Sequence, residues 1–163
     1  LKADGVRFDA SLPEDMTELS DEVLEIIVDG YTELIGYARE RGLRVYIENH
    51  YGITSLADDL LKILDHTPGL YYLFDSWNWN HRRVAEAWLK CMGRASDVHI
   101  KTFFINEAGE DILVNMPSLL DMLEKHHFDG CLTIETMPLD LENERKLIED
   151  SLNLIKSYRR KLK

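Results

Sequence analysis

Five short runs of apolar residues alternate along the chain with longer stretches in which apolar residues recur every three or four positions. The short runs are typical of buried strands and the longer stretches of amphipathic helices. Strands are predicted at residues 5–10, 43–48, 71–75, 97–101 and 131–135. Helices are predicted between and after them, at about 20–41, 55–66, 81–92, 117–126 and 141–158.

This alternation predicts an α/β fold in which helices cover a parallel sheet. No linker or low-complexity segment divides the chain, so residues 1–163 are expected to form a single domain. Five strands would also suit an open, doubly wound sheet, but that fold usually places its ligands at one switch point. A parallel barrel instead gathers residues from many strand ends at one rim.

Residues suited to hold a metal lie at or near the ends of four predicted strands. They are Glu48, Asp75, His99 and Glu135, and the gaps between them are 27, 24 and 36 residues, about the length of one strand, loop and helix. Because the ends of parallel strands meet at one rim, this spacing favours a barrel with a metal site. Three carboxylates and an imidazole suit one divalent ion, with Mn²⁺, Mg²⁺, Co²⁺ and Zn²⁺ all compatible.

Composition narrows the possible partners and location. The formal net charge is −11, with 30 acidic and 19 basic residues, so nucleic acid is not expected as a partner. The apolar runs are too short to span a bilayer, and no membrane partner is expected. Cys91 and Cys131 lack the spacing of a disulfide framework or a zinc ribbon, which favours a cytoplasmic location. Since the chain begins with Leu1, a further segment upstream is expected.

Four segments together resemble one known superfamily. Residues 48–50, 75–78, 99–101 and 130–135 are similar to the xylose isomerase-like TIM barrels, specifically to the sugar phosphate isomerase/epimerase branch. This resemblance implies a (β/α)8 barrel of the xylose isomerase-like type, present here as about five C-terminal βα units. Residues 1–163 would then be an N-terminally truncated TIM barrel. Because open sheet edges invite self-association, a homo-oligomer is one expected outcome.

The resemblance also implies an activity. It assigns one divalent metal to Glu48, Asp75, His99 and Glu135, and it makes Glu48 and Glu135 the catalytic acid and base. The reaction would be isomerisation or epimerisation of a sugar, a sugar phosphate or a polyol by proton transfer through an enediolate. A metal that polarises both substrate oxygens would stabilise such an intermediate.

Four further residues are predicted to bind substrate, namely His50, Lys101, Trp77 and Asn78. Lys101 shares a strand face with His99 and would donate to a substrate oxygen, or it would form an ion pair with Glu48 or Asp75. His50 would bind substrate or hold Glu48 in place, and Trp77 would wall a sugar pocket or pack beneath a loop.

Three alternatives to an isomerase arise from the same residues. A dehydratase of the inosose or dehydroshikimate type shares the fold and the metal site, and a truncated barrel without activity is a second possibility. The endonuclease branch of the superfamily uses additional histidines, but this chain has none between His99 and His126. Some relatives carry a histidine where Asn78 stands and an arginine soon after Lys101, so the resemblance does not assign phosphate or ketose specificity to this chain.

Overall fold

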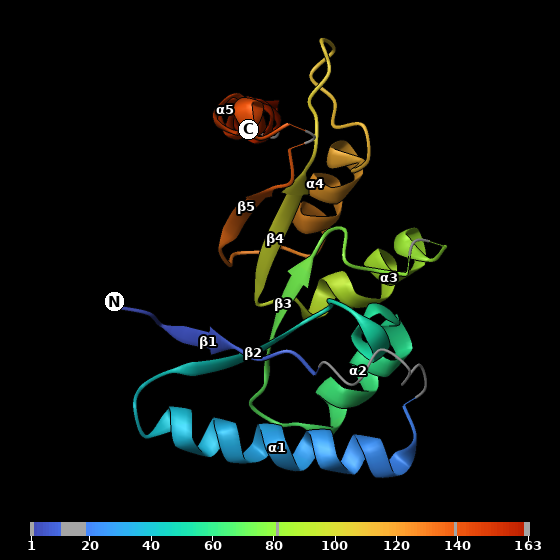
Figure 1. Ribbon diagram of the computed structural model, residues 1–163, viewed down its shortest axis with the longest axis vertical. Helices are drawn as coiled ribbons and strands as arrows, with labels where there is room; N and C mark the ends of the chain where they lie inside the picture. Colours follow the sequence, from blue (N-terminus) through green and yellow to red (C-terminus); the bar gives the residue numbers. More distant parts are fainter. Residues whose placement is uncertain (1, 11–18, 81, 139, 162–163) are drawn as a thin grey trace.

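Five parallel strands pair in the order in which they occur along the chain, and together they form a half-barrel (Figure 1). The computed structural model describes residues 2–10, 19–80, 82–138 and 140–161. The strands are β1 (Gly5–Arg7), β2 (Arg44–Glu48), β3 (Tyr71–Asp75), β4 (Asp97–Thr102) and β5 (Leu132–Thr136). The predicted parallel α/β architecture is therefore confirmed, and β1 and β5 form the two edges of the sheet.

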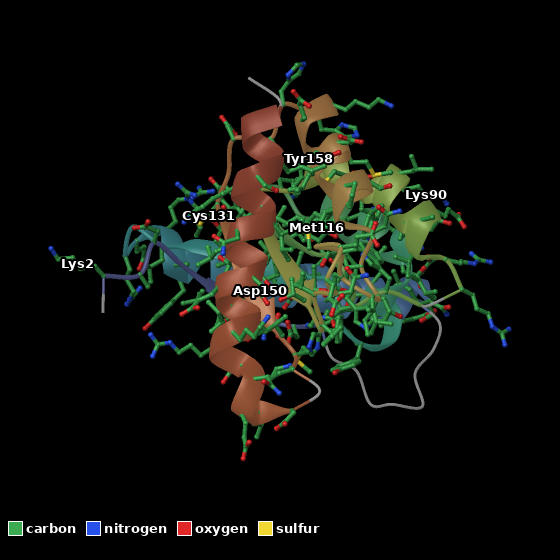
Figure 2. The ribbon with its side chains drawn as sticks, turned by 90° about the horizontal axis from the view of Figure 1, so that it is seen from above. Lys2, Lys90, Met116, Cys131, Asp150 and Tyr158 are labelled. Carbon is green, nitrogen blue, oxygen red and sulfur yellow. The ribbon has the colours of Figure 1, made fainter. Side chains whose placement is uncertain are left out.

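Helices follow each strand along the outer side of this curved sheet (Figure 1). They are α1 (Asp21–Arg39), α2 (Ala57–His66), α3 (Val84–Cys91), α4 (Met116–Lys125) and α5 (Glu144–Lys161). Figure 2 shows α5 running past α4, where the Tyr158 hydroxyl donates a hydrogen bond of 2.7 Å to Asp121. Among the described residues, no helix combines the length and the hydropathy that crossing a membrane requires.

Several predicted boundaries were wrong, including those of the first strand, the second helix and the third helix. The first strand ends at Arg7 rather than at residue 10. Residues Gly52–Ser55 form a separate turn of 3₁₀ helix, so α2 begins only at Ala57, after an extended Leu56. Residue 81, the predicted start of the third helix, lies outside the described residues. That helix begins at Val84, after Asn80 accepts hydrogen bonds from the backbone N–H groups of residues 82 and 83.

Side chains alternate between the two faces of the strands, as the pleat requires. One set is buried against the helices in the hydrophobic core: Val45, Ile47, Tyr72, Phe74, Val98 and Ile100. The residues between them face the inside of the half-barrel, and they include Glu48, Asp75, His99 and Lys101. The apolar outer face thus fixes the register that brings the polar residues together on the inner face.

A glycine before β5 is needed for the close approach of two chain segments. A Cβ atom on Gly130 would lie 2.0 Å from the backbone oxygen of Ser96, whereas one on Gly36 in α1 would meet nothing within 4 Å. We expect Gly130→Ala to lower the free energy of unfolding by about 1–3 kcal/mol, because backbone must move. Gly36→Ala should instead raise it by up to about 1 kcal/mol, as helix propensity predicts. Urea unfolding of both variants checks the opposite signs, and equal stabilities would contradict the expectation.

Candidate metal centre

The structure brings together the four residues predicted as metal ligands. Glu48, Asp75, His99 and Glu135 each offer one ligand atom, and these four atoms all lie within 4.8 Å of one another. Glu48 and Asp75 end β2 and β3, Glu135 is the penultimate residue of β5, and His99 is the third residue of β4. Strand pairing places Asp75 directly beside His99. Glu48 and Asp75 are fully buried, whereas His99 and Glu135 are partly exposed.

Glu48 is held between two basic side chains. Its Oε1 lies 3.1 Å from Nδ1 of His99, and its Oε2 forms an ion pair with the Arg7 guanidinium. Burial alone would raise the pKa of this carboxyl, but the hydrogen bond with His99 and the charge of Arg7 outweigh it. The pKa of Glu48 therefore lies below its usual value, and the group is a carboxylate that is available to a cation.

Asp75 is fixed by the backbone that follows it. Its Oδ1 accepts hydrogen bonds of 2.7 and 2.8 Å from the N–H groups of Trp77 and Asn78, and its Oδ2 faces Nζ of Lys101 at 3.2 Å. Burial raises the pKa of Asp75, and the charge of Lys101 offsets this only in part. The turn after β3 thus aims one carboxylate oxygen into the site.

Lys101 joins two of the candidate ligands. Its ammonium group lies 3.2 Å from Asp75 Oδ2, 3.2 Å from Glu135 Oε2 and 3.0 Å from Asn78 Oδ1, and the residue is only 5% exposed. Burial lowers the pKa of Lys101, but its two carboxylate partners outweigh burial and raise it. Of the two ion pairs considered from the sequence, the one with Asp75 is present. The ammonium group has all three of its protons engaged.

A buried asparagine that the sequence reasoning missed ties β2 to β3. Asn49 donates from Nδ2 to the backbone oxygen of Asp75 at 2.9 Å. Its Oδ1 accepts from the backbone N–H of Asp75 at 2.8 Å and from the Tyr72 hydroxyl at 2.7 Å. Because Asn49 directly follows Glu48, these bonds hold two of the candidate ligands at a fixed separation.

The other residues predicted to bind substrate lie around the same rim. Trp77 packs edge-on against Phe103, with ring centroids 5.1 Å apart. Asn78 accepts from Lys101, and its buried Nδ2 has no hydrogen-bond partner among the described residues. The Nδ1 atom of His50 faces Asp9, at 3.9 Å from Oδ2. Asp9 and Arg7 were not singled out from the sequence.

The donor set is compatible with a divalent metal. Glu48, Asp75 and Glu135 carry three negative charges, while Lys101 supplies one fixed positive charge, so the inner group has an excess of two negative charges. Three carboxylate oxygens and one imidazole nitrogen form a mixed shell suited to Mn²⁺, Mg²⁺, Co²⁺ or Zn²⁺. The charge and the chemistry of the residues therefore both fit one such ion.

Ion binding is expected to depend on the protonation of His99. Its hydrogen bond with Glu48 raises the pKa of His99 above 6.5, although burial opposes this rise. A metal ion must displace the proton of His99 before this imidazole can bind it. As the pH is lowered, the affinity for the metal should therefore begin to fall while the pH is still above 6.5, and below the raised pKa of His99 it should drop by about tenfold per pH unit. Calorimetry with Mn²⁺ between pH 5 and 8.5 measures this fall. Glu48→Gln should move the NMR titration midpoint of His99 in the metal-free protein back toward 6.5, and an unmoved midpoint would contradict the assignment.

The sequence matches a known protein family over most of its length. Residues 7–158 match the family described as xylose isomerase-like TIM barrel. No curated protein sequence matches the chain significantly.

Solved structures similar to this chain include three sugar epimerases. D-allulose 3-epimerase from Methylomonas sp. is 19% identical with a TM-score of 0.62, over 85% of this chain and 57% of that one. For 3-keto-D-glucoside 4-epimerase from E. coli the identity is 16% and the TM-score 0.66, over 91% and 60% of the two chains. D-psicose 3-epimerase, solved in the presence of D-fructose, is 13% identical with a TM-score of 0.55, over 94% and 63%. At these identities the likeness shows the fold, and this chain spans less than two thirds of each similar structure.

Proposed function

Because this chain belongs to the xylose isomerase-like TIM barrel family, we propose that it functions as a divalent-metal-dependent isomerase or epimerase of sugars. One observation carries the proposal: the four ligand atoms of Glu48, Asp75, His99 and Glu135, from four consecutive strands, lie within 4.8 Å of one another. We assign one ion, of Mn²⁺, Mg²⁺, Co²⁺ or Zn²⁺, to these residues. When bound, such an ion polarises adjacent substrate oxygens and favours the enediolate.

Glu135 and Glu48 have different environments, which suggests different roles in proton transfer. The Glu135 side chain is 40% exposed, whereas that of Glu48 is fully buried and has both oxygens engaged, by His99 and Arg7. We therefore assign to Glu135 the removal of the proton from the sugar carbon. Glu48 is assigned as the second acid/base, which acts after Arg7 moves away from Oε2.

The remaining rim residues are assigned to binding. Trp77, supported by Phe103, would cover an apolar side of the sugar, and Asn78 would donate from its unpaired Nδ2 to a hydroxyl. Lys101 is assigned mainly to charge balance because all its protons are engaged. His50 would contact the sugar beside Glu48.

The reaction type is supported by the similar structures, which are named as epimerases acting at C3 or C4 of sugars. The four-residue site alone is compatible with either epimerisation or dehydration. The similar structures therefore supply the support for epimerisation over the dehydratase alternative. Both begin with removal of a proton next to a carbonyl. They differ in whether the proton returns to carbon or a hydroxyl leaves.

A substrate screen on the full-length protein tests the proposal. Mn²⁺-loaded protein is incubated in D₂O with D-fructose, D-psicose, their phosphates, inosose and dehydroshikimate, and NMR follows carbon-bound hydrogen. We expect one ion per chain and exchange of a proton next to the carbonyl together with formation of an isomer. Loss of water from inosose or dehydroshikimate without any isomer would favour the dehydratase. Absence of ion binding would overturn the proposal.

A further inference from the structure

Three polar side chains extend from the candidate metal centre along the edge of the sheet. Arg7 belongs to the edge strand β1, Asp9 follows it, and His50 follows β2. Arg7 contacts Glu48, and its Nε lies 3.4 Å from Asp9 Oδ1. Asp9 Oδ2 in turn lies 3.9 Å from His50 Nδ1. The series thus runs from the ligand Glu48 through Arg7 and Asp9 to His50.

Ion pairs join Arg7 to Glu48 and to Asp9, but hydrogen bonds do not satisfy every polar atom of the series. Asp9 Oδ1 and His50 Nδ1 are buried atoms that lack a hydrogen-bond partner among the described residues. The 3.9 Å between His50 and Asp9 is too long for a direct hydrogen bond. Buried polar atoms usually have a hydrogen-bond partner, so we expect a ligand group that can both donate and accept a hydrogen bond to contact these two atoms. A sugar hydroxyl does both, because it donates to a carboxylate and accepts from an N–H group.

Charge decides which kind of ligand this series accepts. Arg7 and Asp9 cancel each other, and a divalent ion with Lys101 would cancel the three ligand carboxylates. These residues therefore leave no net positive charge for a phosphate or carboxylate group. Lys101 is already shared among three acceptors, so it is not free to receive one. An anion placed beside the Asp9 carboxylate would be repelled.

We propose that Arg7, Asp9 and His50 form a subsite for an uncharged, hydroxylated end of the sugar, in which Asp9 rejects phosphorylated sugars. This inference rests on the proposed function, which places the reacting carbons at the neighbouring metal centre. It narrows the substrate class to neutral sugars and makes Asp9 a specificity-determining residue.

Calorimetry with three probes tests the subsite on the full-length protein. D-fructose, D-fructose 1-phosphate and D-fructose 6-phosphate are titrated into protein with Mn²⁺ and into protein with EDTA. One of the two sugar phosphates carries its phosphate at the end of the sugar that enters the subsite. The original protein should bind that sugar phosphate at least about tenfold more weakly than D-fructose, so the sugar phosphate that binds more weakly identifies this end. Asp9→Asn should weaken D-fructose binding by about tenfold and bring its affinity close to that of this phosphate.

Controls separate this proposal from the proposed function. Asp29→Asn removes the same charge from an exposed position on α1 and should leave all three affinities unchanged. Asp9→Ser replaces Asp9→Asn if the latter does not fold, as judged by circular dichroism. The proposed subsite is wrong if the original protein binds both D-fructose 1-phosphate and D-fructose 6-phosphate at least as tightly as D-fructose. It is also wrong if neither Asp9 variant changes the preference, even where Mn²⁺ binding is intact. If Mn²⁺ does not bind but the Asp9-dependent preference persists with EDTA, the proposed function fails and the subsite stands.

Discussion

Replacing Glu135 by glutamine is expected to lower the turnover of the full-length protein by about 10²- to 10⁴-fold, the usual contribution of a general base. Glutamine keeps the shape of the side chain and one oxygen ligand, but it does not accept a proton from carbon at neutral pH. Glu135 is the most accessible carboxylate of the centre, so no other member of the group is placed to take over its role. Deuterium exchange at the sugar carbon, followed by NMR under saturating Mn²⁺, measures the loss.

The interpretation depends on metal content and on a matched control. Glu33→Gln makes the same change on an exposed part of α1 and should leave exchange unchanged. Metal content of Glu135→Gln is measured alongside, because a protein that regains full exchange once reloaded with Mn²⁺ lost only a ligand. Full deuterium exchange in Glu135→Gln at normal metal content would show that Glu135 is not the base.

The second large effect concerns the stability of the metal-free protein. Lys101→Met is expected to lower the free energy of unfolding by about 3–5 kcal/mol, the cost of removing one partner from a buried ion pair. The ammonium group of Lys101 bridges Asp75 and Glu135, and Asp75 is fully buried. Without Lys101, Asp75 and Glu135 each lose this ion pair. Urea unfolding in EDTA measures the loss.

Saturating Mn²⁺ should restore part of this stability, because an ion that binds Asp75 and Glu135 supplies the missing charge. Lys90 provides the control, since it also bridges two carboxylates, those of Asp58 and Glu86, but at the surface. Lys90→Met should cost far less because water solvates the exposed carboxylates. Equal losses for Lys101→Met and Lys90→Met would show that Lys101 does not balance a buried charge.

The sequence predicted the strands of this sheet better than the helix starts. Strand β3 has both predicted ends in place, because a parallel strand covered on both faces is a continuous apolar run that ends at a polar residue. The start of α3 was missed because Arg83 at its N-cap makes no side-chain capping bond. No capping residue therefore marked that boundary in the sequence.

The candidate site was predictable only where residues share a simple rule. Glu48, Asp75 and Glu135 end or nearly end their strands, and His99 lies within β4 at a similar spacing, so the spacing along the chain indicated all four. Arg7 follows no such rule, and it lies 41 residues from its partner Glu48. Only the pairing of Arg7 with Tyr46 across β1 and β2 reveals the contact. An arginine in a short edge strand otherwise looks like ordinary surface.

The consecutive order of the strands sets the time at which the centre can form during synthesis. Each strand pairs only with its neighbours in the chain, so the sheet can grow unit by unit as the polypeptide leaves the ribosome. Glu48, Asp75 and His99 would be in place before β5 is made, with Lys101 already beside Asp75. Glu135 is the last of the four residues to be synthesised, on β5. The nascent chain would therefore acquire its full affinity for a metal only once β5 has left the ribosome and paired with β4.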